Sequence, residues 1–478
     1  MAPPVGVGSA LADSSAMIPV VTPAEMRAID AAADVDVDVL IGRAGAAVAN
    51  AAREMLDGAE ASRVVVLAGP GNNGADGRAA AVRLEARGVA ATVLDARTLP
   101  SELPASDLVI DAAYGSGFRA DSDRPWDPPD VGAAAVLAVD IPSGVDGLTG
   151  VAVPGALRAD RTVTFQALKP GLLFADGPEL AGGVEVVDIG LDTSLVSCHH
   201  VGRSDADVWW PRRARHAHKW HAAVKVLAGS TEMPGAAELC TAAALRGGAG
   251  LVSLSTPGCR PATRSEVVQR PIPACDFAPE ALADLDRFGA LVIGPGAGRD
   301  DAVAASLCDC IAGADVPIVI DGDAIWALGN ATTAPSEVLR VRRAPTVLTP
   351  HAGEFATLMG DRPGDDRIAA ARAAASTLGS TVLVKGPPTI VADGDSSLVL
   401  LVDHGDARLA TAGSGDVLAG LLGAALSMGV DAPRAAAAAA WLHAQCAHEL
   451  GEEGVVAGDL IDALPDAFGA MRRTETDR

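Results

Sequence analysis

Residues 411–420 read Thr-Ala-Gly-Ser-Gly-Asp-Val-Leu-Ala-Gly, a run of small residues that leads directly into an apolar helical pattern. Such a start leaves the first amide N–H groups of the helix free, and together with the helix dipole they form an anion hole. Asp416 lies in the first turn, where its carboxylate can orient or deprotonate a hydroxyl that attacks a phosphoryl group. The alternative is a flexible helix start in which Asp416 only complements the dipole. The neighbouring motifs favour phosphoryl transfer.

Four other motifs in the second half place small or polar residues directly after an aliphatic run. Lys385 ends one such run and can meet a nucleotide phosphate. His351 follows another, although a lone His at a turn is more often a satisfied turn residue than a ligand, and a lone Lys is usually solvated. The four motifs are Gly229-Ser230-Thr231 with Gly235-Ala236-Ala237, Gly294 to Arg299, Thr346 to Glu354, and Lys385-Gly386-Pro387-Pro388-Thr389.

Short aliphatic runs alternate with Ala-rich helical stretches in both halves, which predicts an α/β fold with two domains, the first a Rossmann-like doubly wound sheet. The predicted strands of the first half are Arg63–Ala68, Ala91–Leu94, Leu108–Asp111, Ala135–Asp140, Arg161–Thr164 and Val184–Asp188. Those of the second half are Val224–Ala228, Leu251–Leu254, Ala290–Ile293, Pro317–Asp321, Thr346–Thr349, Thr381–Lys385 and Ser397–Val402. The run 435–440 is typical of a closely packed core helix.

The 478 residues are enough for two or three domains. Residues 197–221 have no periodicity and concentrate Trp, His and charged residues, so we place the domain boundary there. We predict a disordered leader at 1–20, a first domain at 21–205 and a second at 206–478. His216, His218 and His221 fit a solvated linker better than a closed metal site.

Acidic residues outnumber basic residues by 61 to 37, which gives a formal charge of −24. This balance argues against a nucleic acid or an anionic membrane as partner, because phosphate binding normally needs a basic patch. The seven cysteines include no CxxC pair, so we predict no disulfide framework. The first residues lack the features of a secretory signal, and no apolar run reaches the roughly 18 residues of a spanning helix. We therefore expect a cytoplasmic protein.

In the first half, Gly69-Pro70-Gly71-Asn72-Asn73-Gly74-Ala75-Asp76-Gly77 separates a strand from a helix. Such a loop lets the backbone approach a phosphate at the helix start. The two Asn residues add donors and acceptors for coordination or for ribose and amide recognition. For the loop alone, a tight turn with Asn in left-handed conformations is an equally good interpretation.

Three polar residues follow neighbouring strands of the same half. Asp111 and Asp140 end two strands, and Ser143 follows the second. The carboxyl ends of parallel strands meet in one crevice, so we expect these residues and Asn73 to face one site. Their oxygens suit a weakly held monovalent cation at least as well as Mg²⁺. Capping of the next helix would explain one such Asp, but not two together with the Asn loop.

The motifs PGNNGADG, DAAYGSGFR, AVDIPSGVDGLTG, VTFQALKPGLL and VDIG resemble the epimerase half of the bifunctional NAD(P)H-hydrate repair enzymes, over about residues 22–192. The resemblance implies R/S interconversion at the hydrated C6 of a reduced nicotinamide, with K⁺ held by Asn73, Asp111 and Ser143. The substrate contacts that it implies are Asn72, Asn73, Gly74, Ala75, Asp76, Gly115, Ser116, Gly117, Phe118, Arg119, Ala120, Asp121 and Asp140. Asp140 is our candidate catalytic acid or base, with Asp76 or a water as alternatives.

The motifs His218-Lys219, GS…GAA, GPGAG, LTPHAGEF, VKGPPT and TAGSGDVLAG resemble the dehydratase half of that family, a ribokinase-like fold, over about 218–465. The resemblance implies phosphorylation of the C6 hydroxyl and then loss of phosphate, with Mg²⁺ and ADP or ATP; we expect ADP. Ala237, Gly298, His351 and the catalytic Asp416 would contact the hydrate. Lys385, Gly386, Pro387, Pro388, Thr389 and Gly415 would contact the nucleotide.

Four positions depart from the family pattern. Ala75 stands where relatives usually have Gly, so this position must tolerate a Cβ and should have negative φ. The helix at 39–45 lacks an expected Met-Glu pair, which bears on its packing or on an intersubunit contact. Gly322 and Trp220 replace a usual Ala and Gly.

Two other functions fit the same motifs. A vitamin or sugar kinase would share the ribokinase-like fold, but it would accumulate phosphorylated substrate. The first half could instead be a non-catalytic dimerisation module, against which the presence of Asn73, Asp111, Asp140 and Ser143 argues. For the repair enzyme we expect hydrated NADH and NADPH and ADP or ATP as small-molecule partners, no nucleic acid, no membrane, and a homo-oligomer.

Overall fold

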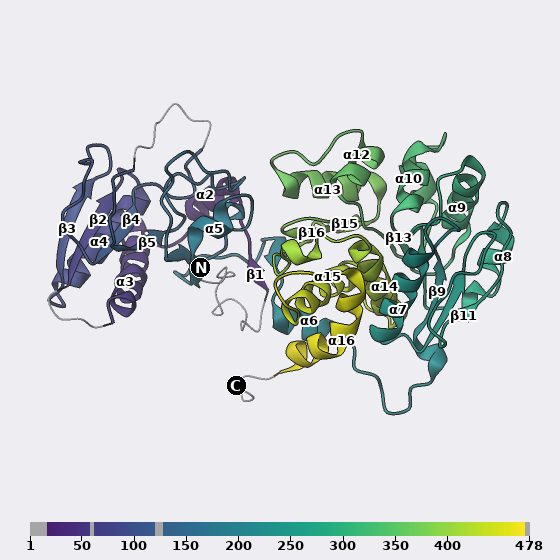
Figure 1. The fold of residues 1–478 in the computed structure, drawn as a ribbon. Coiled ribbons are helices and arrows are strands. Elements are labelled where there is room, and N and C mark those ends of the chain that lie inside the picture. Colours follow the sequence, from purple (N-terminus) through teal and green to yellow (C-terminus); the bar gives the residue numbers. More distant parts are fainter. Residues whose placement is uncertain (1–16, 58–61, 120–127, 474–478) are drawn as a thin grey trace. The chain divides into compact units, whose positions relative to one another are not determined.

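The computed structural model describes residues 17–57, 62–119 and 128–473. It divides the chain into two compact units, 1–200 and 201–478 (Figure 1). The division lies five residues before the predicted boundary at 205/206. The segment 197–221 is less irregular than expected, because it contains β8 (Cys198–His200), α6 (Arg203–Trp209) and most of a 3₁₀ turn at Lys219–Ala222.

The first unit is built on a six-stranded sheet in the order β3-β2-β4-β5-β6-β7, with every neighbouring pair parallel. Strand order reverses between β2 and β4, and in such sheets the crevice beyond that point binds ligands. The strands are β2 (Arg63–Ala68), β3 (Ala90–Asp95), β4 (Leu108–Ala112), β5 (Ala135–Val139), β6 (Arg161–Phe165) and β7 (Gly183–Val187). All six predicted strands of this half are present within one residue at each end.

Helices cover this sheet and close its two cores. Val64 and Val66 of β2 point into one hydrophobic cluster and Val65 and Leu67 into the other, so both faces of the strand are buried. This explains why the strand reads as a continuous apolar run. The helices and turns are α2 (Pro23–Ala32), α3 (Val37–Met55), α4 (Asn72–Glu85), a 3₁₀ turn at Pro170–Leu172 and α5 (Gly177–Ala181).

Two short strands were missed by the sequence analysis. β1 (Ile18–Pro19) lies in the predicted disordered leader 1–20 and pairs antiparallel with β8. Val20 is buried and its N–H donates to the Cys198 carbonyl, 2.8 Å away. The end of the predicted leader is therefore ordered, and residues 1–16 lie outside the described part of the chain.

The second unit has the strand order β17-β16-β15-β14-β13-β12-β9-β10-β11. The pairs from β14-β15 to β10-β11 are parallel, and β15-β16 and β16-β17 are antiparallel. The strands are β9 (Ala223–Leu227), β10 (Leu251–Ser255), β11 (Val268–Gln269), β12 (Ala290–Ile293), β13 (Ile318–Ile320), β14 (Thr346–Leu348), β15 (Thr381–Val384), β16 (Thr389–Ala392) and β17 (Val399–Val402). The prediction missed β11, which has only two residues, and β16, which begins directly after Pro387-Pro388 and so looked like part of the turn.

The helices of the second unit pack closely because the residues at their contacts have small side chains. The run from Ala435 to Ala440 is buried, as predicted, and a Cβ on Gly420 would come within 2.2 Å of the Cys240 carbonyl. The helices are α7 (Pro234–Arg246), α8 (Ala278–Leu282), α9 (Asp301–Gly313), α10 (Asp323–Asn330), α11 (Pro335–Arg340), α12 (Ala352–Met359), α13 (Arg367–Leu378), α14 (Ser414–Ser427), α15 (Ala432–His448) and α16 (Ala457–Arg472). Further 3₁₀ turns are at Leu285–Arg287 and Ala407–Leu409.

Candidate active sites

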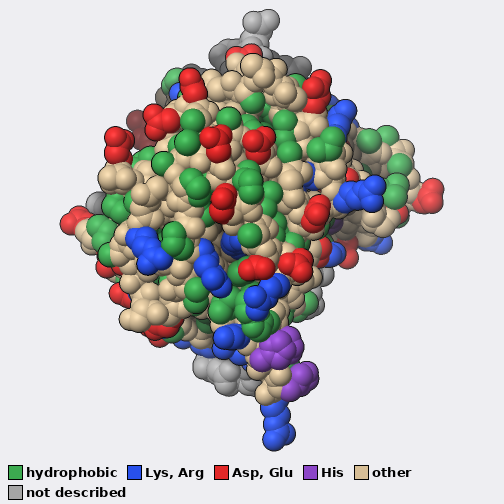
Figure 2. Space-filling view, turned by 90° about the vertical axis from the view of Figure 1, so that its right-hand side faces the viewer, with side chains coloured by type: hydrophobic (Ala, Val, Ile, Leu, Met, Phe, Trp, Pro, Cys, Tyr) green, Lys and Arg blue, Asp and Glu red, His purple; other side chains and the backbone are tan. Residues whose placement is uncertain are grey.

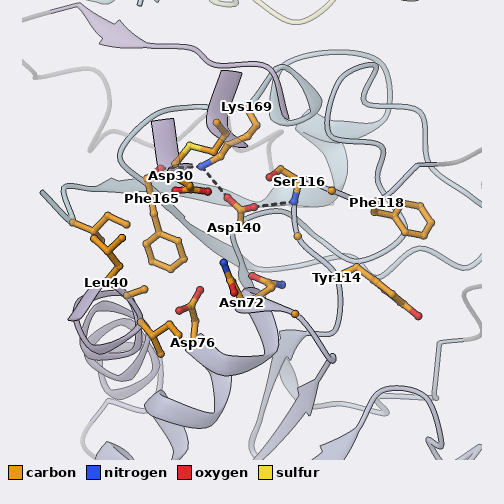
Figure 3. Close-up of a pocket in the computed structure, with 18 of the residues that line it drawn as sticks. Asp30, Leu40, Asn72, Asp76, Tyr114, Ser116, Phe118, Asp140, Phe165 and Lys169 are labelled. Atoms are coloured by element: carbon orange, nitrogen blue, oxygen red, sulfur yellow. Dashed lines mark hydrogen bonds and ion pairs between the residues drawn. The ribbon is translucent and has the colours of Figure 1, made fainter. Parts of the chain in front are cut away.

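The first unit contains a cavity of about 680 Å³ at the carboxyl ends of β2, β4, β5 and β6 (Figure 3). The loop after β2, the loop after β4 and one face of α3 form its walls. Of the predicted substrate contacts, the structure brings these to the cavity: Asn72, Asn73, Asp76, Gly115, Ser116, Gly117, Phe118, Arg119 and Asp140. Ala120 and Asp121 lie outside the described residues.

The Asn loop begins α4 directly. Asn72 is the first helical residue and Gly71 is the N-cap, so the free N–H groups of the first turn are at the loop. A Cβ on Gly74 would come within 1.9 Å of the Gly69 carbonyl oxygen, so this position requires Gly. Ala75 is inside the helix and does not have positive φ, which confirms the conformation predicted for it.

Asp111 and Ser143 form a buried pair beneath the loop that follows β4. The backbone N–H of Ser143 donates to Asp111 Oδ2 at 2.7 Å, and Ser143 Oγ donates to Asp111 Oδ1 at 2.6 Å. Burial raises the pKa of Asp111 to about 6, although the hydrogen bonds from Ser143 oppose this. The Tyr114 N–H donates to Ser143 Oγ at 2.9 Å, so the pair also holds the loop beside the cavity.

The side chain of Asn73 is buried, and neither its Oδ1 nor its Nδ2 has a hydrogen-bond partner among the described residues. A buried amide without partners is costly, so such an atom points to a missing ligand. In the same described part of the chain, no group of three or more His, Cys, Asp or Glu could hold a metal ion. The amide of Asn73 is therefore a candidate contact for a bound ligand at the cavity.

Asp140 forms a buried ion pair that the sequence analysis missed. Lys169 Nζ lies 2.8 Å from Asp140 Oδ1, and the Lys169 side chain is only 1% exposed. Its ammonium also donates to Thr164 Oγ1 and to the carbonyls of Phe165 and Ala167. Burial raises the pKa of Asp140, but the charge and hydrogen bond of Lys169 outweigh this and hold the pKa below its usual value.

Two further carboxylates face the same cavity. Burial and the nearby charges of Asp140 and Asp30 raise the pKa of Asp76 to about 8. The pKa of Asp30 is also raised, mainly by burial, although the charge of Lys169 lowers it. Asp76 is on α4 and Asp30 is on α2, and Figure 3 shows Asp30 close beside the Asp140–Lys169 pair and Asp76 lower in the view. A carboxylate that stays protonated near neutral pH can donate a proton.

The second unit places its predicted anion hole at the start of α14. Gly413 is the N-cap in left-handed conformation, with φ of 87°, and no side chain caps the helix. Buried Ser414 Oγ lies 3.1 Å from His443 Nε2, which fixes the first helical residue. Burial and the nearby charge of Asp321 raise the pKa of Asp416 to about 7, although Lys385 opposes the rise.

Lys385 lies beside this helix start. Its Nζ donates to Asp321 Oδ1 at 2.6 Å, and Thr349 Oγ1 donates to the same oxygen at 2.7 Å. A Cβ on Gly415 would lie 3.1 Å from Lys385 Nζ, so Gly415 leaves room for the lysine. The structure therefore brings Lys385 together with Gly415 and Asp416, which come from two motifs that are separate in the sequence.

The residues predicted to contact the hydrate, other than Asp416, are held by contacts within the protein. His351 caps α12, and its Nδ1 accepts from the N–H groups of Gly353 and Glu354. Gly298 has φ of 102°, and its N–H donates to Asp323 Oδ2 at 2.9 Å. Ala237 is fully buried, so its contact with a ligand stays a prediction that its position does not favour.

The backbone of the predicted nucleotide-binding turn after β15 is held by side-chain hydrogen bonds. Arg367 donates to the carbonyls of Pro387 and Pro388. Thr389 Oγ1 donates to the Gly386 carbonyl at 3.3 Å, and Thr389 begins β16. These contacts fix the backbone of the turn and leave Lys385 on the side of α14.

Both halves of the chain match known families. A model described as NAD(P)H-hydrate dehydratase matches residues 224–467, and one described as YjeF-related protein N-terminus matches 37–104 and 94–171. The bifunctional NAD(P)H-hydrate repair enzyme Nnr of Mycobacterium tuberculosis is 39% identical over 400 residues, which cover 78% of this chain and 80% of the relative. The chain belongs to the family of bifunctional NAD(P)H-hydrate repair enzymes.

Other members of this repair-enzyme family match along most of the chain. The enzyme of the same name from Moorella thermoacetica is 32% identical over 520 residues, covering 93% of this chain and 96% of the relative. Among solved structures, a ribokinase-like superfamily protein from Enterococcus faecalis V583 has a TM-score of 0.50 at 21% identity and covers 57% of this chain and 96% of its own. This likeness confirms the ribokinase-like fold of the second unit.

A second solved structure is similar to the same half of this repair-family chain. The ADP/ATP-dependent NAD(P)H-hydrate dehydratase of Bacillus subtilis, co-crystallised with ATP/Mg²⁺, is 27% identical, with a TM-score of 0.48, and covers 56% of this chain and 97% of its own.

Among the described residues of the present chain, no helix is both long and apolar enough to cross a bilayer.

In this repair-family chain, the three histidines of the segment predicted to be a solvated linker are exposed to solvent. The rings of His218 and His221 lie 3.7 Å apart between centroids, and His216, His218 and His221 are exposed. Figure 2 shows histidines gathered at one edge of the face that it draws, with acidic and basic side chains interspersed over the rest. No cluster of metal-ligating side chains is present within 17–57, 62–119 and 128–473.

Proposed function

We propose that this protein repairs hydrated NADH and NADPH, with an epimerase site in the first unit and an ADP- or ATP-dependent dehydratase site in the second. The first unit supports the proposal with a cavity lined by the Asn loop and Asp140. The observation that carries the dehydratase is the convergence of Lys385 and Asp416 at the open start of α14.

In the dehydratase site, Asp416 acts on the C6 hydroxyl of the hydrate. A base is most effective when its pKa is near the working pH, and the pKa of Asp416 is about 7. Asp416 takes the hydroxyl proton as the oxygen attacks the phosphoryl group, and the N–H groups at the start of α14 stabilise the transferring charge. Phosphate then leaves C6 far more easily than hydroxide would, and loss of a proton from C5 restores the C5–C6 double bond of the reduced ring.

The nucleotide is held on the Lys385 side of this helix start. We assign its contacts to Lys385, Gly415 and the turn 386–389, and we propose ADP as the donor. Mg²⁺ would enter with the phosphates and reduce their charge, and the buried carboxylates of Asp321 and Asp323 provide the negative surroundings that favour it. We assign Gly298, His351 and Ala237 to the hydrate side.

In the epimerase site, we assign K⁺ to Asn73, Asp111 and Ser143, because the buried Asn73 amide has no other described partner. K⁺ would supply a fixed positive charge for the loops around the cavity. The substrate contacts are Asn72–Asp76 and Gly115–Arg119. Asp140, held as a carboxylate by Lys169, faces the ring and stabilises the positive charge that develops on it.

The test is to incubate the separated R and S hydrates with ADP or with ATP, with and without K⁺, and to follow absorbance near 340 nm. We expect the S hydrate to need only nucleotide, and the R hydrate to be recovered faster than its spontaneous epimerisation when K⁺ is present. Accumulation of a phosphorylated substrate without return of absorbance would indicate a kinase instead. A homo-oligomer and a cytoplasmic location, where these cofactors are used, complete the proposal.

A further inference from the structure

The epimerase cavity contains more acid than its cation can balance. Asp30, Asp76 and Asp140 line the cavity together with one buried ammonium, that of Lys169 (Figure 3). Lys169 is in direct contact with Asp140 and also lowers the pKa of Asp30. Arg119 lines the cavity as well, but its Nη1 donates to the carbonyls of Ser116 and Phe118. Asp30 is exposed to solvent, but with Asp76 and Asp140 both ionised the Lys169 ammonium would have to balance two largely buried carboxylates.

Asp140 is poorly placed to carry a proton during catalysis. Its Oδ1 is bound by Lys169 and accepts from Thr164 Oγ1, and its Oδ2 accepts from the Ser116 N–H at 2.8 Å. Protonation of Asp140 would break the ion pair and leave the Lys169 ammonium buried without its counter-charge, which is costly. Asp140 therefore stays ionised throughout the reaction.

Asp76 has the opposite environment. It is 8% exposed and lines the cavity from the start of α4, and it has no hydrogen-bond or ion-pair partner among the described residues. The nearby charges that act on it most strongly are those of Asp140 and Asp30, and both disfavour its ionised form. Of the three acids it is therefore the one for which the neutral form costs least.

We infer that Asp76 is the catalytic residue that donates and recovers the proton during epimerisation, beside a permanently charged Asp140–Lys169 pair. This inference rests on the epimerase activity proposed above. It reverses the order of candidates drawn from the sequence, where Asp140 was placed first.

The proposed epimerisation uses one proton, which leaves Asp76 and returns to it. Asp76 donates its proton to the C6 hydroxyl, the C6–O bond breaks with its electron pair on oxygen, and water leaves. The lone pair of the ring nitrogen forms a C6–N double bond, and the cationic ring is stabilised by the carboxylates of Asp76 and Asp140. Water then adds to either face of C6, the nitrogen regains its lone pair, and the surplus proton of the added water returns to Asp76.

The other charged and titratable groups that line the cavity come from four elements besides α4. They are Asp30 on α2, Tyr114 and Arg119 after β4, Asp140 after β5 and Lys169 after β6. The cavity-lining residues of α3 are apolar. Because the neutral acid is the active form, the rate of epimerisation should be level at neutral pH and fall as the pH rises through about 8.

The experiment compares Asp76→Asn, Asp140→Asn and Glu85→Gln with the unaltered protein, in saturating K⁺ between pH 6 and 10. Glu85 is exposed at the far end of α4 and is the matched control. Interconversion of the R and S hydrates is followed by chromatography after subtraction of the spontaneous rate. Dehydration of the S hydrate by the second unit and the melting temperature of each variant report that the chain is folded.

We expect Asp76→Asn to lose a factor of roughly 10² to 10⁴ in the rate of epimerisation and to lose the alkaline fall. Asp140→Asn should be slower but keep the fall, moved to lower pH, because removal of that negative charge eases ionisation of Asp76. Glu85→Gln should behave like the unaltered protein. An unchanged rate and pH profile in Asp76→Asn, or loss of the fall in Asp140→Asn alone, would overturn the inference. If the unaltered protein does not interconvert the hydrates, it is the proposed epimerase function that fails.

Discussion

Replacement of Asp416 by Asn should inactivate the dehydratase and at the same time stabilise the protein. The pKa of Asp416 rises from its usual range near 4 to about 7, chiefly because the carboxylate is buried near Asp321. A rise of that size corresponds to about 4 kcal/mol of destabilisation of the ionised form. Asp416 is partly exposed, and solvent screens part of this penalty, so we expect Asp416→Asn to gain about 1 to 2 kcal/mol at pH 8.

The sign of the pH dependence distinguishes this effect from a general gain in packing. When the pKa is raised in the folded state, the cost in folding free energy is zero below the unfolded pKa near 4. This cost grows as the pH rises towards 7 and is constant above that. The advantage of Asp416→Asn should therefore be about 2 to 8 °C in melting temperature at pH 8 and should largely disappear at pH 4. Differential scanning calorimetry at the two pH values measures it, with Asp309→Asn on the exposed side of α9 as the control.

The same variant should lose the dehydratase rate by a factor of roughly 10² to 10⁴, as expected for removal of a general base. In the unaltered protein, the recovery of absorbance from the S hydrate should slow as the pH falls through about 7, because the protonated acid cannot accept the hydroxyl proton. A variant that is stabilised at pH 8 but dehydrates at the unaltered rate would show that Asp416 is merely a buried acid. A variant that is inactive without the gain in stability would refute the argument from burial.

Three other substitutions test the remaining contacts. Asn73→Ala should abolish the stimulation of epimerisation by K⁺, measured as rate against K⁺ concentration, while the S hydrate is dehydrated normally. Lys385→Met should destabilise the second unit by about 3 kcal/mol in calorimetry, because it leaves Asp321 buried without its counter-charge, and it should abolish use of ADP. Gly74→Ala should abolish epimerisation in the same R-hydrate assay, because its Cβ would overlap the Gly69 carbonyl.

The sequence predicts a site best where one local pattern places the residue. The Asn loop lies between a clearly predicted strand and a clearly predicted helix, so Asn73 could be assigned to a ligand site in advance, whereas Asp76 was assigned by the family resemblance. The strand-end positions of Asp111 and Asp140 follow from the parallel order of the sheet. What these carboxylates do could not be derived, because that depends on which charges surround them.

Those charges come from positions that no local pattern connects. Lys169 follows the strand after the one that ends at Asp140, and a buried lysine looks like a solvated one in sequence. Lys385 and Asp321 are 64 residues apart, and their contact depends on β13 and β15 each lying beside β14. The ion pairs therefore required the tertiary structure.

The two units use the same electrostatic arrangement for different proton chemistry. Each has a buried Lys–Asp ion pair, Lys169–Asp140 or Lys385–Asp321, beside a second carboxylate near the start of a helix that follows a Gly-containing loop. Burial is the largest cause of the raised pKa of both free acids, and a neighbouring carboxylate adds to it, Asp321 for Asp416 and Asp140 for Asp76; Lys385 opposes the rise at Asp416. At neutral pH Asp416 is partly ionised and can accept a proton, whereas Asp76 is mostly neutral and can donate one. The two proposed roles, Asp416 as base and Asp76 as acid, therefore both rest on a carboxylate whose raised pKa brings its titration close to neutral pH.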